Sequence, residues 1–106
     1  MSKIKVLLVK PSCKPVAIEI DDGLKSLQNA VGGYIEAVYP FEDPVAIICN
    51  EEGKLIPLTP NRALYDDNGK MYDIICGDFL VVGLTEDNFG SLSDELIAKY
   101  TELFRW

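Results

Sequence analysis

Residues 79–84 are the part of the chain that most constrains its fold. They read Phe-Leu-Val-Val-Gly-Leu, a run of successive positions without a polar side chain. Successive side chains of a strand point to opposite faces of its sheet, so a short unbroken apolar run predicts a strand that is buried on both faces. We expect this strand at or near the centre of a mainly antiparallel sheet.

Other short runs rich in strand-forming residues flank this one along the chain. Residues 3–10 and 15–20 are β-branched runs separated by a turn-like stretch, and together they predict an N-terminal hairpin. Residues 34–39 predict another strand, which stops at Pro40 because proline lacks the N–H that a strand ladder needs.

The middle of the chain is rich in turn signals. Residues 45–49 and 54–56 flank an Asn-Glu-Glu-Gly turn and predict a second hairpin. Residues 61–64 follow Pro60 and indicate a single helical turn. Residues 66–69, Asp-Asp-Asn-Gly, predict a tight turn, because Gly supplies a positive φ and Asn and Asp tolerate one.

A short helix is expected near residues 23–31. Asp21-Asp22-Gly23 offers an N-cap, and Gly32-Gly33 supplies the left-handed residue that ends many helices. Between these signals the apolar residues recur at helical spacing, at Leu24, Leu27 and Val31.

A second helix is expected near residues 92–104, with Ser91 or Ser93 as its N-cap. Its apolar face is predicted to pack on the sheet. The residues of that face are Leu92, Leu96, Tyr100, Leu103 and Phe104.

These elements predict an α+β fold in one domain over residues 1–106. A chain of this length can bury enough surface for one core without metal or disulfide staples. The order hairpin, helix, strand at the start resembles the opening of a ubiquitin-like β-grasp, which is a topological hint and implies no function.

The charge balance excludes several classes of partner. The net charge is −7 and the pI is about 4.4, which opposes binding to nucleic acid or to an anionic membrane. The charge is uneven: residues 1–30 carry five Lys and three acidic residues, so a small cationic patch is available for one anionic ligand. No long apolar run or cleavable leader is recognisable, so we expect a cytoplasmic protein.

The chain contains no histidine, which removes Ser-His-Asp and Cys-His catalysis and imidazole metal ligands together. Its three cysteines, Cys13, Cys49 and Cys76, include no CxxC pair, and we interpret them as free thiols in a reducing compartment. We expect no catalytic residue, no metal and no cofactor. An enzyme using carboxylates or Cys49 would need a perturbed pKa, which sequence does not reveal.

Adjacent acidic residues occur as pairs at predicted turns or helix starts. Neighbouring side chains do not share a strand or helix face, so such a pair is not a catalytic dyad by itself. Asp66-Asp67-Asn68-Gly69 also lacks the register and the closing Glu of a calcium loop. The pairs are Asp21-Asp22, Glu42-Asp43, Glu51-Glu52, Asp66-Asp67, Glu86-Asp87 and Asp94-Glu95.

The candidate binding residues are Arg62, Asn61, Tyr34 and Tyr39, which all lie near predicted loops. A guanidinium fork suits a phosphate or carboxylate, and a tyrosine ring can stack on a base. The alternative is structural, because tyrosines often pack at the edge of a core and an arginine in an acidic chain often pairs with a carboxylate.

Three segments resemble a family of small bacterial and phage proteins classed as a domain of unknown function. They are Val-Gly-Gly-Tyr-Ile-Glu at residues 31–36, Cys-Asn-Glu-Glu-Gly-Lys at residues 49–54 and Asn-Arg-Ala-Leu at residues 61–64. Members tend to be encoded in phages, prophages and conjugative elements, so the resemblance implies a role in manipulating host physiology or immunity. It implies no activity and no site residues.

The functional hypothesis is therefore a non-enzymatic binding protein of a phage or mobile element that sequesters a small nucleotide-derived host signal. The alternative is an acidic protein that blocks a basic host surface, including by mimicking DNA. A small anionic ligand, a host protein and a second copy of the chain are the open partners, whereas nucleic acid and membrane are not expected.

Overall fold

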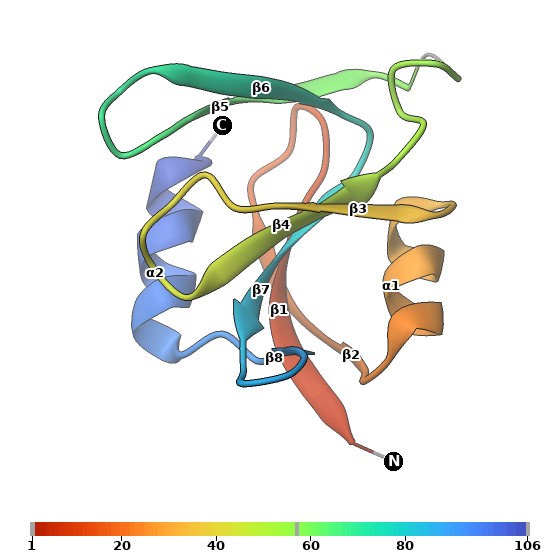
Figure 1. Ribbon diagram of the computed structural model, residues 1–106, viewed down its shortest axis with the longest axis vertical. Helices are drawn as coiled ribbons and strands as arrows, with labels where there is room; N and C mark the ends of the chain where they lie inside the picture. The colour runs from red at the N-terminus through yellow and green to blue at the C-terminus, as the bar shows by residue number, and fades with distance from the viewer. Residues whose placement is uncertain (1, 57, 106) are drawn as a thin grey trace.

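The computed structural model describes residues 2–56 and 58–105 and has an α+β architecture, as expected (Figure 1). The elements in chain order are β1 (Lys3–Val9), β2 (Val16–Asp21), α1 (Leu24–Val31), β3 (Ile35–Val38), β4 (Val45–Asn50), β5 (Pro60–Tyr65), β6 (Met71–Cys76), β7 (Phe79–Leu84), β8 (Phe89–Gly90) and α2 (Asp94–Leu103).

The main sheet has the strand order β2-β1-β7-β4-β3, with β8 paired to β7, and all of its pairings are antiparallel. The apolar strand β7 lies in the middle, where Val81 is opposite Leu7 of β1 and Ile47 of β4. The predicted central position of residues 79–84 is confirmed. The order hairpin, helix, strand is also present, but a ubiquitin-like β-grasp pairs its first and central strands in parallel, whereas β1 and β7 are antiparallel.

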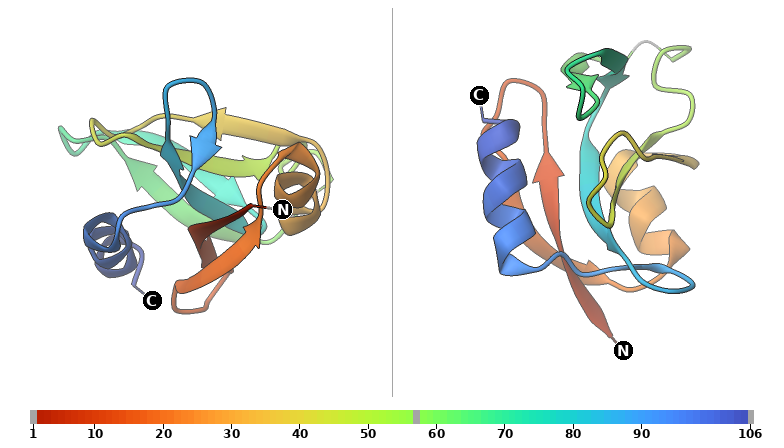
Figure 2. Two further views of the ribbon diagram at one scale, coloured as in Figure 1. Left: turned by 90° about the horizontal axis from the view of Figure 1, so that it is seen from below. Right: turned by 60° about the vertical axis from the view of Figure 1, so that its left-hand side comes forward.

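The two helices cover opposite faces of this sheet (Figure 2). On one face Leu27 and Val31 of α1 pack in a cluster with alternate residues of β7, Leu80 and Val82. On the other face Tyr100 and Phe104 pack with the intervening residues, Phe79 and Val81. Because each face has its own helix, the central strand is apolar at successive positions.

Strands β5 and β6 form a separate two-stranded hairpin that crosses one end of the main sheet (Figure 1). Leu64 and Ile75 of the hairpin are buried in the same cluster as α2. Two predictions are therefore wrong: residues 61–64 are strand rather than a helical turn, and residues 54–56 form a turn rather than a strand. The predicted turn at residues 66–69 lies at the tip of the hairpin.

The helix ends are partly as predicted. Ser93 caps α2, its hydroxyl accepting from the N–H of Leu96, whereas the N-cap of α1 is Gly23, without a side-chain cap. Gly32 ends α1 with a φ of 79°, as the Gly-Gly signal indicates. Leu103, which was predicted to face the sheet, is 55% exposed because Phe104 fills that position at the end of α2.

The two edge strands of the main sheet carry acidic residues, whereas the interior strands β1, β4 and β7 carry none. The edges are β2 and β3, and each carries one exposed glutamate near its middle, Glu19 or Glu36. The central strands β4 and β7 carry no charged residue. Among the described residues, no helix is long and apolar enough to cross a membrane.

Candidate functional site

Arg62 of β5 joins three segments of the chain through its guanidinium. Its Nε and Nη2 donate to the carbonyl oxygen of Phe104 at 3.2 and 3.0 Å, and Nη2 donates to the carbonyl oxygen of Cys13 at 2.7 Å. The hairpin is thereby tied to the end of α2 and to the β1–β2 turn. Burial lowers the pKa of Arg62, and within residues 2–56 and 58–105 its guanidinium also donates to the side-chain amide oxygen of Asn61.

Asn61 is buried and supports this arrangement. Its Nδ2 donates to the carbonyl oxygens of Val9 and Gly77, both at 2.9 Å. Its Oδ1 accepts from Nη1 of Arg62 at 2.7 Å. The geometry therefore favours the structural interpretation of the Asn61–Arg62 pair, with Asn61 joining β5 to β1 and to the start of β7.

Tyr34 and Tyr39 lie on either side of β3 and are both exposed, by 69% and 53%. They line separate hollows: Tyr34 beside the end of α1, and Tyr39 beside the loop that carries Glu42 and the turn that carries Asp67. Neither hollow is lined by Arg62 or Asn61. The structure thus separates the four sequence-predicted residues instead of gathering them into one site.

The hollow beside α1, which we name the Tyr34 hollow, has a volume of about 430 Å³. Its size falls in the range of small-molecule sites. Lys25, Gln28 and Asn29 of α1 form one wall, and their i, i+3 and i+4 spacing puts them on one face of the helix. The other lining residues are Gly32, Gly33, Tyr34, Asn50, Glu52 and Ile56.

Asn50 fixes the floor of the Tyr34 hollow. It is only 7% exposed, its Nδ2 donates to the carbonyl oxygen of Val31 at 3.1 Å, and its Oδ1 accepts from the N–H of Glu52 at 2.8 Å. A Cβ on Gly33 would lie 2.9 Å from this Nδ2, so glycine allows the close approach. The end of α1 and the turn after β4 are consequently held together around one buried amide.

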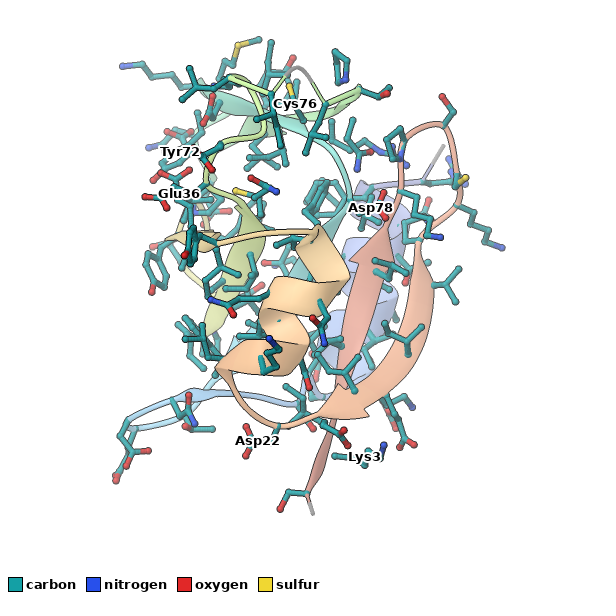
Figure 3. All side chains as sticks on the ribbon, turned by 90° about the vertical axis from the view of Figure 1, so that its right-hand side faces the viewer. Lys3, Asp22, Glu36, Tyr72, Cys76 and Asp78 are labelled. Atoms are coloured by element: carbon teal, nitrogen blue, oxygen red, sulfur yellow. The ribbon has the colours of Figure 1, made fainter. Side chains whose placement is uncertain are left out.

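A second hollow, of about 480 Å³, lies on the other side of α1 and shares Asn29 with the first. Its apolar residues include Leu8, Ile18 and Ile20. Figure 3 shows Lys3 and Asp78, which also line it, toward opposite ends of the region beside α1. Lys3 is paired with Asp21 at 2.9 Å, so this hollow has lysines and carboxylates together and no aromatic ring.

Cys49 and Cys76 line a small cleft of about 80 Å³ with Lys54 and Asp73. Burial, with a smaller contribution from the charge of Glu36, raises the pKa of the Cys49 thiol to about 11. A thiol with a raised pKa is a poor nucleophile, because the thiolate is the reactive form. The described residues also contain no group of three or more Cys, Asp or Glu side chains placed to hold a metal ion.

The sequence-based search found Tyr34 but missed its neighbours on α1. The usable signal was the polar face of the predicted helix, at Lys25, Gln28 and Asn29, immediately before Gly-Gly-Tyr. Polar residues on an exposed helix face are common, so this pattern indicates a binding surface only when the fold shows that the residues line a hollow.

Residues 4–105 match the model of a family described as "Domain of unknown function (DUF3846)". The chain belongs to this family. The DUF3846 match covers both helices and the lining of the Tyr34 hollow, and it confirms the expected membership of a family without assigned function. No curated protein and no solved structure matches the chain.

Proposed function

We propose that this DUF3846 protein is a non-enzymatic binding protein, encoded by a phage or mobile element, that sequesters a small nucleotide-derived immune signal in the host cytoplasm. The observation that carries the proposal is the Tyr34 hollow, which gathers an exposed aromatic ring, a lysine and three side-chain amides around about 430 Å³. The binding residues are Tyr34, Lys25, Gln28 and Asn29, with Arg62 and Asn61 supporting the fold.

Each of these groups matches one part of a nucleotide. The face of a tyrosine ring stacks on a base, and side-chain amides form paired hydrogen bonds with base edges. Glu52, which also lines the hollow, can accept from an exocyclic amino group. Lys25 makes no ion pair within the described part of the chain, so its ammonium is available for a phosphate.

The position of the hollow also supports an anionic ligand. Lys25 belongs to the N-terminal thirty residues, which carry five lysines and three acidic residues, whereas residues 31–106 carry five basic and fourteen acidic residues. The charged residues that line the hollow, Lys25 and Glu52, balance each other, so an anion meets less repulsion there than at the acidic turns. The cytoplasmic placement is supported by the three free cysteines, which a reducing compartment preserves.

The first experiment is native mass spectrometry of the protein purified from phage-challenged cells, because it reports a retained ligand and the number of subunits together. Any retained nucleotide, and a panel of purified mononucleotides, cyclic mononucleotides and cyclic dinucleotides, is then titrated by calorimetry. We expect one nucleotide class to bind with a stoichiometry of one per Tyr34 hollow.

The second experiment places the site with a matched pair of variants. Tyr34→Ala removes the stacking ring and is expected to weaken binding roughly 5- to 150-fold, because stacking on one base contributes about 1–3 kcal/mol. Tyr39→Ala removes a similarly exposed tyrosine outside the hollow and should leave affinity unchanged. Lys25→Glu should weaken binding of phosphorylated ligands more than of the free nucleoside.

Two results would contradict the proposal. The first is the absence of binding across the nucleotide panel together with no retained ligand. The second is undiminished affinity in Tyr34→Ala. Direct capture of a basic host protein without any nucleotide would instead favour the acidic interaction protein as the function.

A further inference from the structure

The outer face of the β5–β6 hairpin exposes a group of apolar side chains that no element of the described chain covers. Ala63 is directly opposite Ile74, and Tyr65 is directly opposite Met71. All four are exposed, whereas Leu64 and Ile75, on the inner side of the same strands, are buried. We name Ala63, Tyr65, Met71 and Ile74 the hairpin patch.

Neighbouring residues enlarge this apolar surface. Tyr72, beside the register irregularity of the hairpin, is 48% exposed, and Leu55 is 80% exposed. Leu55 lies in the turn after β4, which is held against β6 by the ion pair between Lys54 and Asp73. Contiguous exposed apolar groups mark interaction sites, and tyrosine and methionine are enriched in the centres of protein interfaces.

The charges around the hairpin patch are mostly negative. Asp66 and Asp67 lie in the turn at the tip of the hairpin, and Glu36 and Glu51 line the same small cleft as Ile74. Of the two lysines nearby, Lys54 is already paired with Asp73, which leaves Lys70 against these carboxylates. The patch therefore has an apolar centre and an acidic border.

The acidic border favours a different protein, rather than a second copy of this chain, as the partner that covers the hairpin patch. In a symmetric dimer each patch would face its own acidic border across the interface, and placing like charges together at an interface lowers affinity. A partner with a basic border has no such cost and gains from steering by opposite charge.

We propose that the hairpin patch is a docking surface for a protein segment that presents apolar side chains between lysines or arginines. This surface is separate from the Tyr34 hollow, so binding at one is removable without altering the residues of the other.

A displayed library of short random peptides, selected on the intact protein, tests this docking surface. We expect the enriched sequences to combine aromatic or aliphatic residues with flanking Lys or Arg, and their dissociation constants to rise with salt. In the double variant Tyr65→Thr/Ile74→Thr, which keeps strand propensity but removes apolar area, affinity for those peptides should fall at least tenfold.

Leu24→Gln provides the matched control, because Leu24 is a similarly exposed apolar residue on α1. It should bind the selected peptides like the unaltered protein, as should Tyr34→Ala. The circular dichroism spectrum of the double variant must match that of the unaltered protein before their peptide affinities are compared. If the double variant does not fold, the single variant Tyr65→Thr is tested in its place.

Three outcomes would overturn the proposal. Enriched peptides without basic residues would exclude the stated chemistry, and equal binding by the double variant would exclude the location. A concentration-dependent dimer of the unaltered protein that Tyr65→Thr/Ile74→Thr abolishes would instead identify a second copy as the occupant.

Discussion

The main sheet and the β5–β6 hairpin are built from strands of similar length, but they differ in how many of their faces are covered. Strands β4 and β7 have a helix on each side, and nearly all of their residues are buried. Strands β5 and β6 pack on the core through one side and leave the other exposed. The doubly covered strands therefore contribute most of the core, whereas the hairpin leaves apolar side chains in contact with solvent.

The largest expected difference between the two regions comes from burying a charge. Val81→Asp puts a carboxylate at a fully buried position of β7, and the cost of several kcal/mol is comparable with the whole stability of a small domain. Ile74→Asp makes the matching change on the hairpin, where the new carboxylate stays hydrated.

Circular dichroism and thermal melting should show Val81→Asp unfolded and Ile74→Asp folded, with a loss of no more than about 1 kcal/mol. A native melting curve for Val81→Asp would show that β7 is not the centre of the core.

A smaller effect is expected from the contact that attaches the hairpin to the rest of the chain. Arg62→Ala leaves the carbonyl oxygens of Phe104 and Cys13 without their guanidinium donor. Because hydrogen bonds to charged groups contribute about 1.5–3 kcal/mol, we expect a loss of about 2–3 kcal/mol in urea denaturation. Arg105→Ala, at an exposed ion pair with Glu102, is the control and should change stability by less than about 0.5 kcal/mol. Equal effects of the two variants would refute the anchoring role.

A contact between helix α2 and the loop before β4 makes the stability of the protein depend on pH. Asp43 accepts from Lys99 Nζ at 2.6 Å and from the hydroxyl of buried Tyr100 at 2.8 Å, and these bonds hold the pKa of Asp43 below its ordinary value. A carboxyl whose pKa is lower when folded stabilises the protein above its unfolded pKa. That contribution is lost as pH falls below about 4.

Asp43→Asn should therefore be less stable than the unaltered protein at neutral pH, by about 1–2 kcal/mol, and the gap should narrow in acid. Denaturation midpoints measured from neutral to acidic pH would check this. A gap that stays constant over that range would contradict the assignment of the contact to ionised Asp43.

The smallest expected effect is local opening of the folded chain, which the alkylation rates of the three cysteine thiols report. Cys13 is exposed, Cys76 at the end of β6 is half-buried, and Cys49 in β4 is buried with a pKa raised to about 11. Alkylation followed by mass spectrometry should label Cys13 first, Cys76 more slowly and Cys49 only when denaturant is added. Rapid labelling of Cys49 in the folded protein would show a reactive thiolate and reopen the possibility of cysteine catalysis.

The sequence predicted the sheet better than the hairpin for a physical reason. An apolar run such as residues 79–84 is favourable in a strand that is buried on both faces, and the structure buries β7 in this way. Residues 60–65 follow a different rule, because buried Asn61 and half-buried Arg62 are satisfied by carbonyl oxygens of residues 9, 13, 77 and 104. Hydrogen bonds to such distant residues leave no pattern in the local sequence. The residues after Pro60 therefore led to the prediction of a helical turn instead of a strand.

The sequence likewise indicated some residues of the candidate site and did not indicate others. Tyr34 was a candidate because it is an aromatic residue near a predicted loop, and in the structure it lines a hollow. Lys25, Gln28 and Asn29 were not candidates, because whether they line a hollow depends on how α1 lies against the turn after β4, where Asn50 holds the two together. The interpretation of Arg62 as a ligand-binding residue rested on its chemistry and on its position near a predicted loop, and neither indicates which oxygen atoms its guanidinium faces.

Glu19 and Glu36, the exposed residues near the middle of β2 and β3, affect what happens when many copies of the chain accumulate in one cell. The outer backbone groups of an edge strand are a template on which another chain can add a strand, and repeated addition produces fibrils. A charged side chain on each edge makes that addition unfavourable, because an incoming strand must place its own residues beside a carboxylate. These two glutamates therefore favour high concentrations of the protein without strand-by-strand polymerisation.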